Sequence, residues 1–258
     1  MFVDSHCHLD FPELAADREQ VLALMEANRV THALTISTTL ATLPDVLKVA
    51  ESHPRIFASV GVHPDEERDG REVTLDELLE LARHPKVVAI GETGLDYYRL
   101  TEPLDWQRDR FRTHIRAAKA CSKPLVIHTR NAADDTLRIM REESAGEAGG
   151  VMHCFTETTA VAEAAMEQGF HISFSGIVTF KNAKDLKETA KAVPLERMLI
   201  ETDSPYLAPT PFRGKMNQPG YVKHVAEEIA ALKGISVEEV AEATTANFFR
   251  LFKAANRG

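Results

Sequence analysis

Short apolar runs alternate with longer amphipathic stretches along nearly the whole chain. The apolar runs predict eight strands, over Phe2–Ser5, Ala33–Ser37, Ile56–Val62, Val87–Gly91, Leu125–His128, Gly150–Cys154, His171–Ser175 and Met198–Thr202. The stretches between them have helical spacing and predict helices over Asp17–Asn28, Ala41–Ser52, Leu75–Arg83, Leu104–Ala120, Ala133–Glu143, Ala160–Glu167 and Ala183–Ala192. Two more helices are predicted at the end of the chain, over Tyr221–Lys233 and Val237–Phe252.

Alternation of this kind indicates an α/β fold with parallel strands. Nearly continuous apolar strands are typical of parallel sheets, because crossover helices cover the sheet faces. Eight such units predict a (β/α)8 barrel of the TIM type with additional C-terminal helices. A doubly wound open sheet is the alternative, but the first strand is followed by His6 and His8 rather than by a glycine-rich phosphate loop.

Composition adds limits to this picture. The 258 residues are 44% hydrophobic, and no linker interrupts them, so a single domain over residues 1–258 is expected. No apolar run approaches the roughly 20 residues of a membrane span, no signal-peptide pattern is present, and three cysteines do not suggest a disulfide framework. We therefore expect a cytoplasmic protein without a membrane partner. Its oligomeric state is left open, with a monomer favoured.

The net charge of −9 repels polyanions at long range. Any contact with nucleic acid must therefore come from a local basic patch or from bound cations.

Histidines and carboxylates stand at the C-terminal ends of the predicted strands, where (β/α)8 barrels carry their active sites. His6 and His8 are two residues apart at one strand end, so their side chains point the same way. The others follow later strands: His63, Glu92, His128, His153 and Asp203. Burying such groups together without a cation would be costly, so the sequence predicts a metal site.

This mixture of imidazoles and carboxylates suits Zn²⁺, Mn²⁺, Fe²⁺ or Mg²⁺ in a catalytic rather than a structural site. Glu92 or Asp203 can bridge two ions about 3.5–4 Å apart. Two ions at a polar mouth predict a hydrolase that activates water and stabilises charge on a carbonyl or phosphoryl oxygen.

The motifs at these strand ends resemble those of one known family. They are Asp4-Ser5-His6-Cys7-His8-Leu9-Asp10, Val60-Gly61-Val62-His63-Pro64, Gly91-Glu92-Thr93-Gly94-Leu95-Asp96-Tyr97-Tyr98, Pro124-Leu125-Val126-Ile127-His128-Thr129-Arg130, His153-Cys154-Phe155 and Glu201-Thr202-Asp203-Ser204-Pro205-Tyr206-Leu207. In this order they resemble the TatD-type metal-dependent deoxyribonucleases of the amidohydrolase-like superfamily. The resemblance extends from residue 2 to about residue 252.

The resemblance implies a (β/α)8 barrel with a two-metal phosphodiesterase site. Carried over position by position, one ion would be held by His6, His8 and Asp203, the second by His128 and His153, with Glu92 between them. Asp203 would also orient or deprotonate the attacking water, so Glu92 and Asp203 are the expected catalytic residues. The implied substrate is DNA, as single strands or 3′ ends, degraded by a 3′-5′ exonuclease with Mg²⁺ or Mn²⁺.

Several residues are candidates for substrate contact. Arg213 and Lys215 follow the last strand and would either clamp a phosphate or form a solvated pair of loop charges. Family members commonly have a further cation where this chain has Met216. His63 would contact substrate or shape a turn, and Arg130 would reach a phosphate or form a structural ion pair.

Two other functions compete with the nuclease. A related amidohydrolase would cleave a small ester or amide, but many of those carry a modified lysine on the fourth strand, where this chain has Glu92. A partner-binding protein with a disused metal site is the non-enzymatic alternative. The intact set of candidate ligands argues against it.

Overall fold

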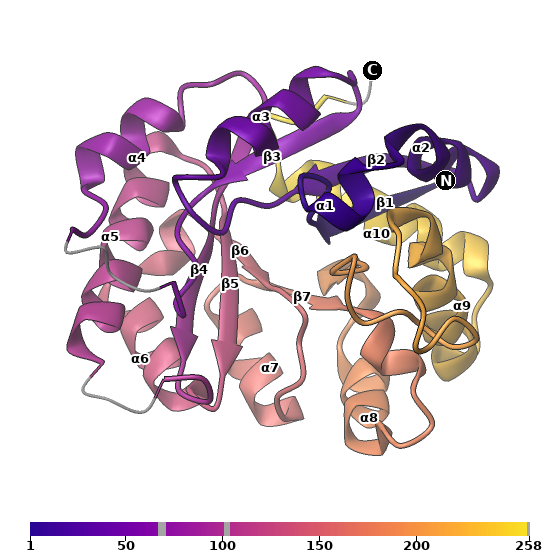
Figure 1. Cartoon of the computed structure of the whole chain (residues 1–258). Coiled ribbons are helices and arrows are strands. Elements are labelled where there is room, and N and C mark those ends of the chain that lie inside the picture. Colours follow the sequence, from indigo (N-terminus) through magenta and orange to yellow (C-terminus); the bar gives the residue numbers. More distant parts are fainter. Residues whose placement is uncertain (67–70, 101–103, 257–258) are drawn as a thin grey trace.

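The computed structural model describes residues 1–66, 71–100 and 104–256. Within them, one eight-stranded sheet pairs its strands in chain order, from β1 to β8, and every pairing is parallel (Figure 1). The strands are β1 (Phe2–Cys7), β2 (Val30–Thr35), β3 (Ile56–Val60), β4 (Val87–Asp96), β5 (Leu125–Arg130), β6 (Gly150–Met152), β7 (His171–Phe174) and β8 (Met198–Ile200). The predicted (β/α)8 barrel is confirmed.

Helices cover the outside of the barrel. In chain order they are α1 (Pro12–Ala15), α2 (Arg18–Ala27), α3 (Leu43–Glu51), α4 (Leu75–Leu81), α5 (Asp105–Cys121), α6 (Ala133–Glu142), α7 (Thr159–Glu167), α8 (Lys184–Ala192), α9 (Val222–Lys233) and α10 (Val237–Leu251). Figure 1 shows α4, α5 and α6 outside β4 and β5. No helix in the described ranges is long and apolar enough to span a membrane.

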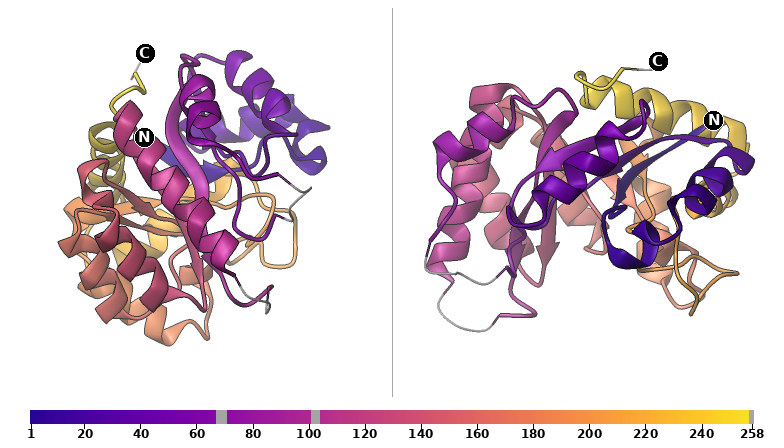
Figure 2. Two further views of the ribbon diagram at one scale, coloured as in Figure 1. Left: turned by 90° about the vertical axis from the view of Figure 1, so that its left-hand side faces the viewer. Right: turned by 45° about the horizontal axis from the view of Figure 1, so that its top comes forward.

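The additional C-terminal helix α10 packs against the barrel itself and lies beside β1 (Figure 2). Phe248 of α10 and Phe252 directly after it are fully buried in a cluster with strand residues such as Val3, Phe57 and Leu199. A second, larger cluster lies between the strands and the outer helices. Apolar side chains of the strands are therefore buried on both faces of the sheet.

Element boundaries depart from the prediction mainly at the C-terminal ends of strands. β4 continues to Asp96, five residues beyond the predicted end at Gly91, because it pairs with β5 across a register shift between Ile90 and Thr93. β6 and β8 are shorter than predicted. His153 and Asp203 consequently lie in the segments that follow these strands.

The barrel closes between β1 and the segment after β8. Cys7 and Ser204 form a parallel bridge, the Asp203 N–H donates to the His6 carbonyl at 2.9 Å, and the His8 N–H donates to the Ser204 carbonyl at 2.9 Å. Asp4 joins the same two segments with its side chain. It accepts from the Thr202 N–H at 2.9 Å and from the Thr202 hydroxyl at 2.5 Å.

Asp4 is fully buried, and burial raises the pKa of its carboxyl to about 8 despite these hydrogen bonds. It also accepts from the His6 N–H at 3.3 Å. The carboxyl therefore links β1, which carries His6, to the segment after β8, which carries Asp203.

We expect Asp4→Ala to lower the free energy of unfolding by about 3 kcal/mol, because it leaves buried donors of Thr202 without their acceptor. Urea denaturation in the presence of a chelator measures this. Asp17→Ala is the control, because Asp17 is exposed and makes no capping hydrogen bond. Its expected effect is within about 0.5 kcal/mol. Equal stability of the two variants would contradict the role of Asp4.

Candidate metal centre

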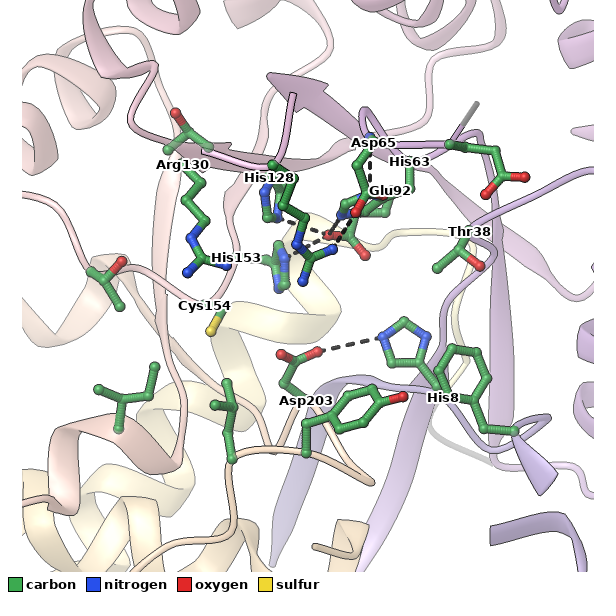
Figure 3. Close-up of a pocket in the computed structure, with 18 residues that line it drawn as sticks. His8, Thr38, His63, Asp65, Glu92, His128, Arg130, His153, Cys154 and Asp203 are labelled. Atoms are coloured by element: carbon green, nitrogen blue, oxygen red, sulfur yellow. Dashed lines mark hydrogen bonds and ion pairs between the residues drawn. The ribbon is translucent and has the colours of Figure 1, made fainter. Parts of the chain in front are cut away.

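The six predicted metal ligands converge at the C-terminal mouth of the barrel. Figure 3 shows five of them, His8, Glu92, His128, His153 and Asp203, around one cavity. Three of them lie within strands: His6 in β1, Glu92 in β4 and His128 in β5. His8, His153 and Asp203 lie just beyond the ends of β1, β6 and β8. Asp203 has a φ of 56°, a left-handed conformation that costs a non-glycine residue free energy and is often found at functional sites.

Glu92 is the centre of the cluster, and its two oxygens face different imidazoles. Oε2 is 3.4 Å from Nε2 of His6. Oε1 is 2.8 Å from Nε2 of His153, 3.3 Å from Nδ1 of His128 and 3.3 Å from Nε2 of His63. Residues far apart in the sequence therefore meet at one carboxylate.

Two glycines allow β4 to bring Glu92 to this position. A Cβ at Gly94 would lie 1.9 Å from the carbonyl oxygen of His128, and one at Gly91 would lie 2.6 Å from that of Val126. Both glycines also have positive φ, which other residues rarely adopt. The close approach of β4 to β5 thus depends on the Gly91-x-x-Gly94 spacing on either side of Glu92.

Asp203 faces the imidazoles of His6 and His8 on the other side of the cluster. Its Oδ1 lies 3.4 Å from Nε2 of His8 and 3.5 Å from Nε2 of His6. The ring of His6 stacks on that of His153 at 3.8 Å, which joins the two sides.

Most of the imidazoles use their second nitrogen for an outer hydrogen bond. His153 Nδ1 is 3.1 Å from Glu201, and His128 Nε2 is 3.0 Å from Asp96. His63 Nδ1 contacts Asp65, and His8 Nδ1 lies 3.4 Å from the Ile36 carbonyl. Such outer acceptors fix the ring orientation of metal-binding histidines and direct the other nitrogen toward the ion.

The neighbouring histidines keep the two carboxylates of the cluster ionised. Burial alone would raise the pKa of Glu92, but the positive charges of His153 and His63 outweigh it and hold that pKa well below its usual range. Burial likewise opposes ionisation of Asp203, yet His8 and His6 keep its pKa low. The carboxylates are therefore ionised at neutral pH, as ligands of a cation must be.

The donor set fits divalent cations. Three groups each have donor atoms within 4.8 Å of one another: His6, His8 and Asp203; His6, His153 and Glu201; His63, Glu92 and His128. Among the described residues, both ring nitrogens of His6 and Nε2 of His153 are buried without a hydrogen-bond partner. A divalent cation would compensate buried imidazole nitrogens that face carboxylates in this way.

A stripe of buried polar side chains on α5 holds the segment that carries His63. The backbone N–H of Val62 donates to His114 Nε2 at 3.0 Å. Arg110 donates to the His63 carbonyl at 3.0 Å, and Gln107 donates to the Pro64 carbonyl at 2.9 Å. Three successive residues after β3 are thus fixed by three residues on one face of the helix.

The cluster opens into a cavity of about 580 Å³, a size typical of ligand pockets. Arg130 lines it, with its guanidinium 3.9 Å from the centre of the Tyr98 ring. Arg213 and Lys215 are not among the described residues that line the cavity. Both are exposed, and Arg213 lies over the ring of Phe180. A phosphate clamp by these two residues stays a prediction.

Several residues at the site were not singled out from the sequence. Arg99 lines the cavity and pairs with Asp65, while Asp96 and Glu201 support histidines. The spacing of two of them could have indicated a role, because residues an even number of positions apart in an extended chain point to the same side. Asp96 is four residues after Glu92, and Glu201 is two residues before Asp203. No comparable signal distinguishes Arg99 from other loop cations.

Comparison with known proteins identifies the family. Residues 3–253 match the family of TatD related DNases. The chain belongs to this TatD family. YcfH of Escherichia coli K12, an uncharacterized metal-dependent hydrolase, is 48% identical over 253 residues, which cover 97% of this chain and 95% of YcfH. The 3′-5′ ssDNA/RNA exonuclease TatD of Escherichia fergusonii is 30% identical over 254 residues, covering 96% of this chain and 98% of that protein.

A solved structure gives the same result. The crystal structure of YjjV, a TatD homologue from Escherichia coli K12, superposes with a TM-score of 0.91 at 28% identity, over 98% of each chain. The resemblance read from the motifs is confirmed, and the chain is a metal-dependent hydrolase of the TatD family.

We expect Glu201→Gln to lower the affinity for Mn²⁺ or Zn²⁺ by about tenfold, because outer carboxylates raise the basicity of ligand histidines. Titration of the metal-stripped protein against a competing chelator measures the affinity. Glu163→Gln, an exposed change on α7, is the matched control and should leave it unchanged. If both variants bind metal like the unaltered protein, Glu201 has no part in the site.

The α5 stripe predicts a dependence on pH. Burial lowers the pKa of His114 from 6.5 to about 4, so the folded protein keeps this ring neutral while the unfolded chain protonates it. Its contribution to stability is therefore full above pH 6.5 and is lost as the pH falls toward 4. Between about pH 7.5 and about pH 5, the unaltered protein should lose up to about 2 kcal/mol more than His114→Gln. Urea denaturation at both pH values measures this, and parallel losses would contradict it.

Proposed function

We propose that this protein is a phosphodiesterase that removes nucleotides from the 3′ ends of DNA with the help of two divalent cations. The observation that carries the proposal is the position of Glu92, whose Oε2 faces His6 while its Oε1 faces His128 and His153. A carboxylate whose oxygens face two sets of imidazoles is suited to bridge two cations.

The ligands divide into two sets. His6, His8 and Asp203 would hold one cation, and His128 and His153 would hold the other, with Glu92 shared. His63 lies as near to Glu92 as His128 does, so it borders the second set and can also reach a substrate oxygen. Mg²⁺ or Mn²⁺ suits the proposed activity, while Zn²⁺ and Fe²⁺ also suit a set this rich in imidazole.

When bound, such cations polarise a phosphoryl oxygen and lower the pKa of water. The protein's own contribution to the proton transfer is assigned to Asp203. Its Oδ1 faces the imidazoles of His6 and His8, so Oδ2 is the oxygen that would accept a proton from the attacking water. Because its pKa is held low, Asp203 is ionised at neutral pH, as a proton acceptor must be.

Two arginines of the protein would bind the phosphate backbone. Arg130 and Arg99 line the cavity next to the cluster. A guanidinium can bind phosphate oxygens through two parallel hydrogen bonds. These local charges would offset the repulsion expected from the net charge of −9.

The substrate and the direction of attack rest on the relatives. The family is that of TatD related DNases, and the Escherichia fergusonii relative is a 3′-5′ ssDNA/RNA exonuclease. We therefore propose single-stranded 3′ ends as the substrate.

Hydrolysis of a single-stranded oligonucleotide labelled at its 3′ end tests the proposal. The metal-stripped protein should be inactive, and Mg²⁺ or Mn²⁺ should restore release of the labelled mononucleotide as the first product. Asp203→Asn should lower kcat at least about 100-fold, as expected for loss of a general base and ligand. Glu92→Ala should abolish turnover and lower the number of ions bound.

Asp185→Asn, an exposed change on α8, is the control and should keep full activity. Internal cleavage before release of the terminal nucleotide would point to an endonuclease. No cleavage by a protein loaded with metal would overturn the nuclease, and small esters and amides would then be tested. Cleavage that persists in Asp203→Asn would overturn the role of this carboxylate.

A further inference from the structure

Two aromatic side chains border the cavity beside the metal cluster, Phe11 after β1 and Tyr206 after β8. Each lies three residues after a candidate ligand and is tied to it by a turn. The Phe11 N–H donates to the His8 carbonyl at 3.2 Å, and the Tyr206 N–H donates to the Asp203 carbonyl at 3.1 Å. The positions of the two rings are therefore coupled to the cluster.

The two rings form a small aromatic wall. Phe11 stacks on the ring of His8 at 4.6 Å and 20°, and it meets Tyr206 edge to face at 6.2 Å and 72°. Leu207 and Ile177, which also line the cavity, add apolar surface.

Tyr206 has a fixed backbone and an exposed ring. The buried Asn217 donates to the Tyr206 carbonyl at 2.6 Å and to the Thr202 carbonyl at 2.8 Å. The residue nevertheless keeps 54% of its surface exposed. A large aromatic side chain that is held in place but left open to solvent is typical of a binding surface.

The cavity is polar on one side and apolar on another. Figure 3 shows Arg130 across the cavity from His8, against which Phe11 stacks. A nucleotide has the same division, since its phosphate is anionic and its base offers an apolar face. A segment of DNA with its phosphate toward Arg130 would turn a base toward the aromatic wall.

We propose that Phe11 and Tyr206 form a stacking site for one nucleobase next to the scissile phosphodiester. The site rests on the proposed nuclease function and adds to it the part of the substrate that the protein binds besides the phosphate. Every base has a π-face, so stacking accepts all four bases. The neighbouring Leu207 and Ile177 cannot hydrogen-bond to base edges through their side chains. Binding should therefore depend on the presence of a base and little on its identity.

A cycle of variants and substrates tests the stacking site. The proteins are the unaltered chain, Tyr206→Ala and Tyr206→Phe. The substrates are a single-stranded oligonucleotide and two versions of it, with an abasic residue at the terminal or the penultimate 3′ position. Fluorescence anisotropy with the metal-stripped proteins measures binding, and release of the terminal nucleotide with Mn²⁺ gives KM and kcat.

On the intact oligonucleotide, Tyr206→Ala should weaken binding and raise KM by about tenfold, the usual worth of one stacked base. Tyr206→Phe keeps the ring and should behave like the unaltered protein. On one of the two abasic oligonucleotides, Tyr206→Ala should cause no further loss, because the partner of the ring is already missing. If Tyr206 had only a structural role, Tyr206→Ala would weaken binding of the abasic oligonucleotides as well.

Met216→Ala is the matched control, since Met216 is exposed in the same loop but lies outside the described lining of the cavity. It should leave binding unchanged. The same loss for Tyr206→Ala on all three oligonucleotides, or no loss on the intact one, would overturn the stacking site while the nuclease function stands. An unaltered protein that neither binds nor cleaves the oligonucleotide would overturn both proposals. Unchanged metal content of each variant shows that the cluster is intact.

Discussion

The carboxylate of Glu92 is the interaction on which the architecture of this protein depends. It is almost completely buried, and its oxygens lie within about 3.5 Å of imidazoles that come from β1, from β5 and from the segments after β3 and β6. An ionised carboxylate in such a place is tolerated only because cationic or metal-bound groups surround it. That arrangement requires a closed barrel. It also requires the close approach of β4 to β5 at Gly91 and Gly94.

Around this centre, many polar groups of the protein orient the histidine side chains. Glu201, Asp96 and Asp65 each contact the outer nitrogen of a histidine, and Arg110 on α5 holds the backbone of the segment after β3. Buried polar groups of this kind add little net stability, since their hydrogen bonds replace those with water. What they provide is a fixed direction for each imidazole, which a metal site with defined geometry requires.

The mouth of the barrel has an apolar side, formed by the aromatic wall, and a positively charged side, formed by two arginines. The segments after β1 and β8 supply the apolar side through Phe11 and Tyr206. On the other side, Arg99 follows β4 and Arg130 is the last residue of β5. Loops at the C-terminal ends of barrel strands can vary without disturbing the core, so such a division can be built without altering the metal ligands.

The sequence by itself determined the order and type of the elements and identified the candidate ligand residues. Both are local properties: apolar periodicity reports a strand or a helix, and a polar residue at a strand end is recognised from its immediate neighbours. Even spacing along the chain could have indicated Glu201, but only the tertiary structure decided that Asp65 supports His63 and that Arg99 rather than Arg213 reaches the cavity. These outcomes depend on where loops and long side chains lie once the barrel has closed. That placement is set by contacts between residues far apart in the chain, and spacing along the sequence does not encode it.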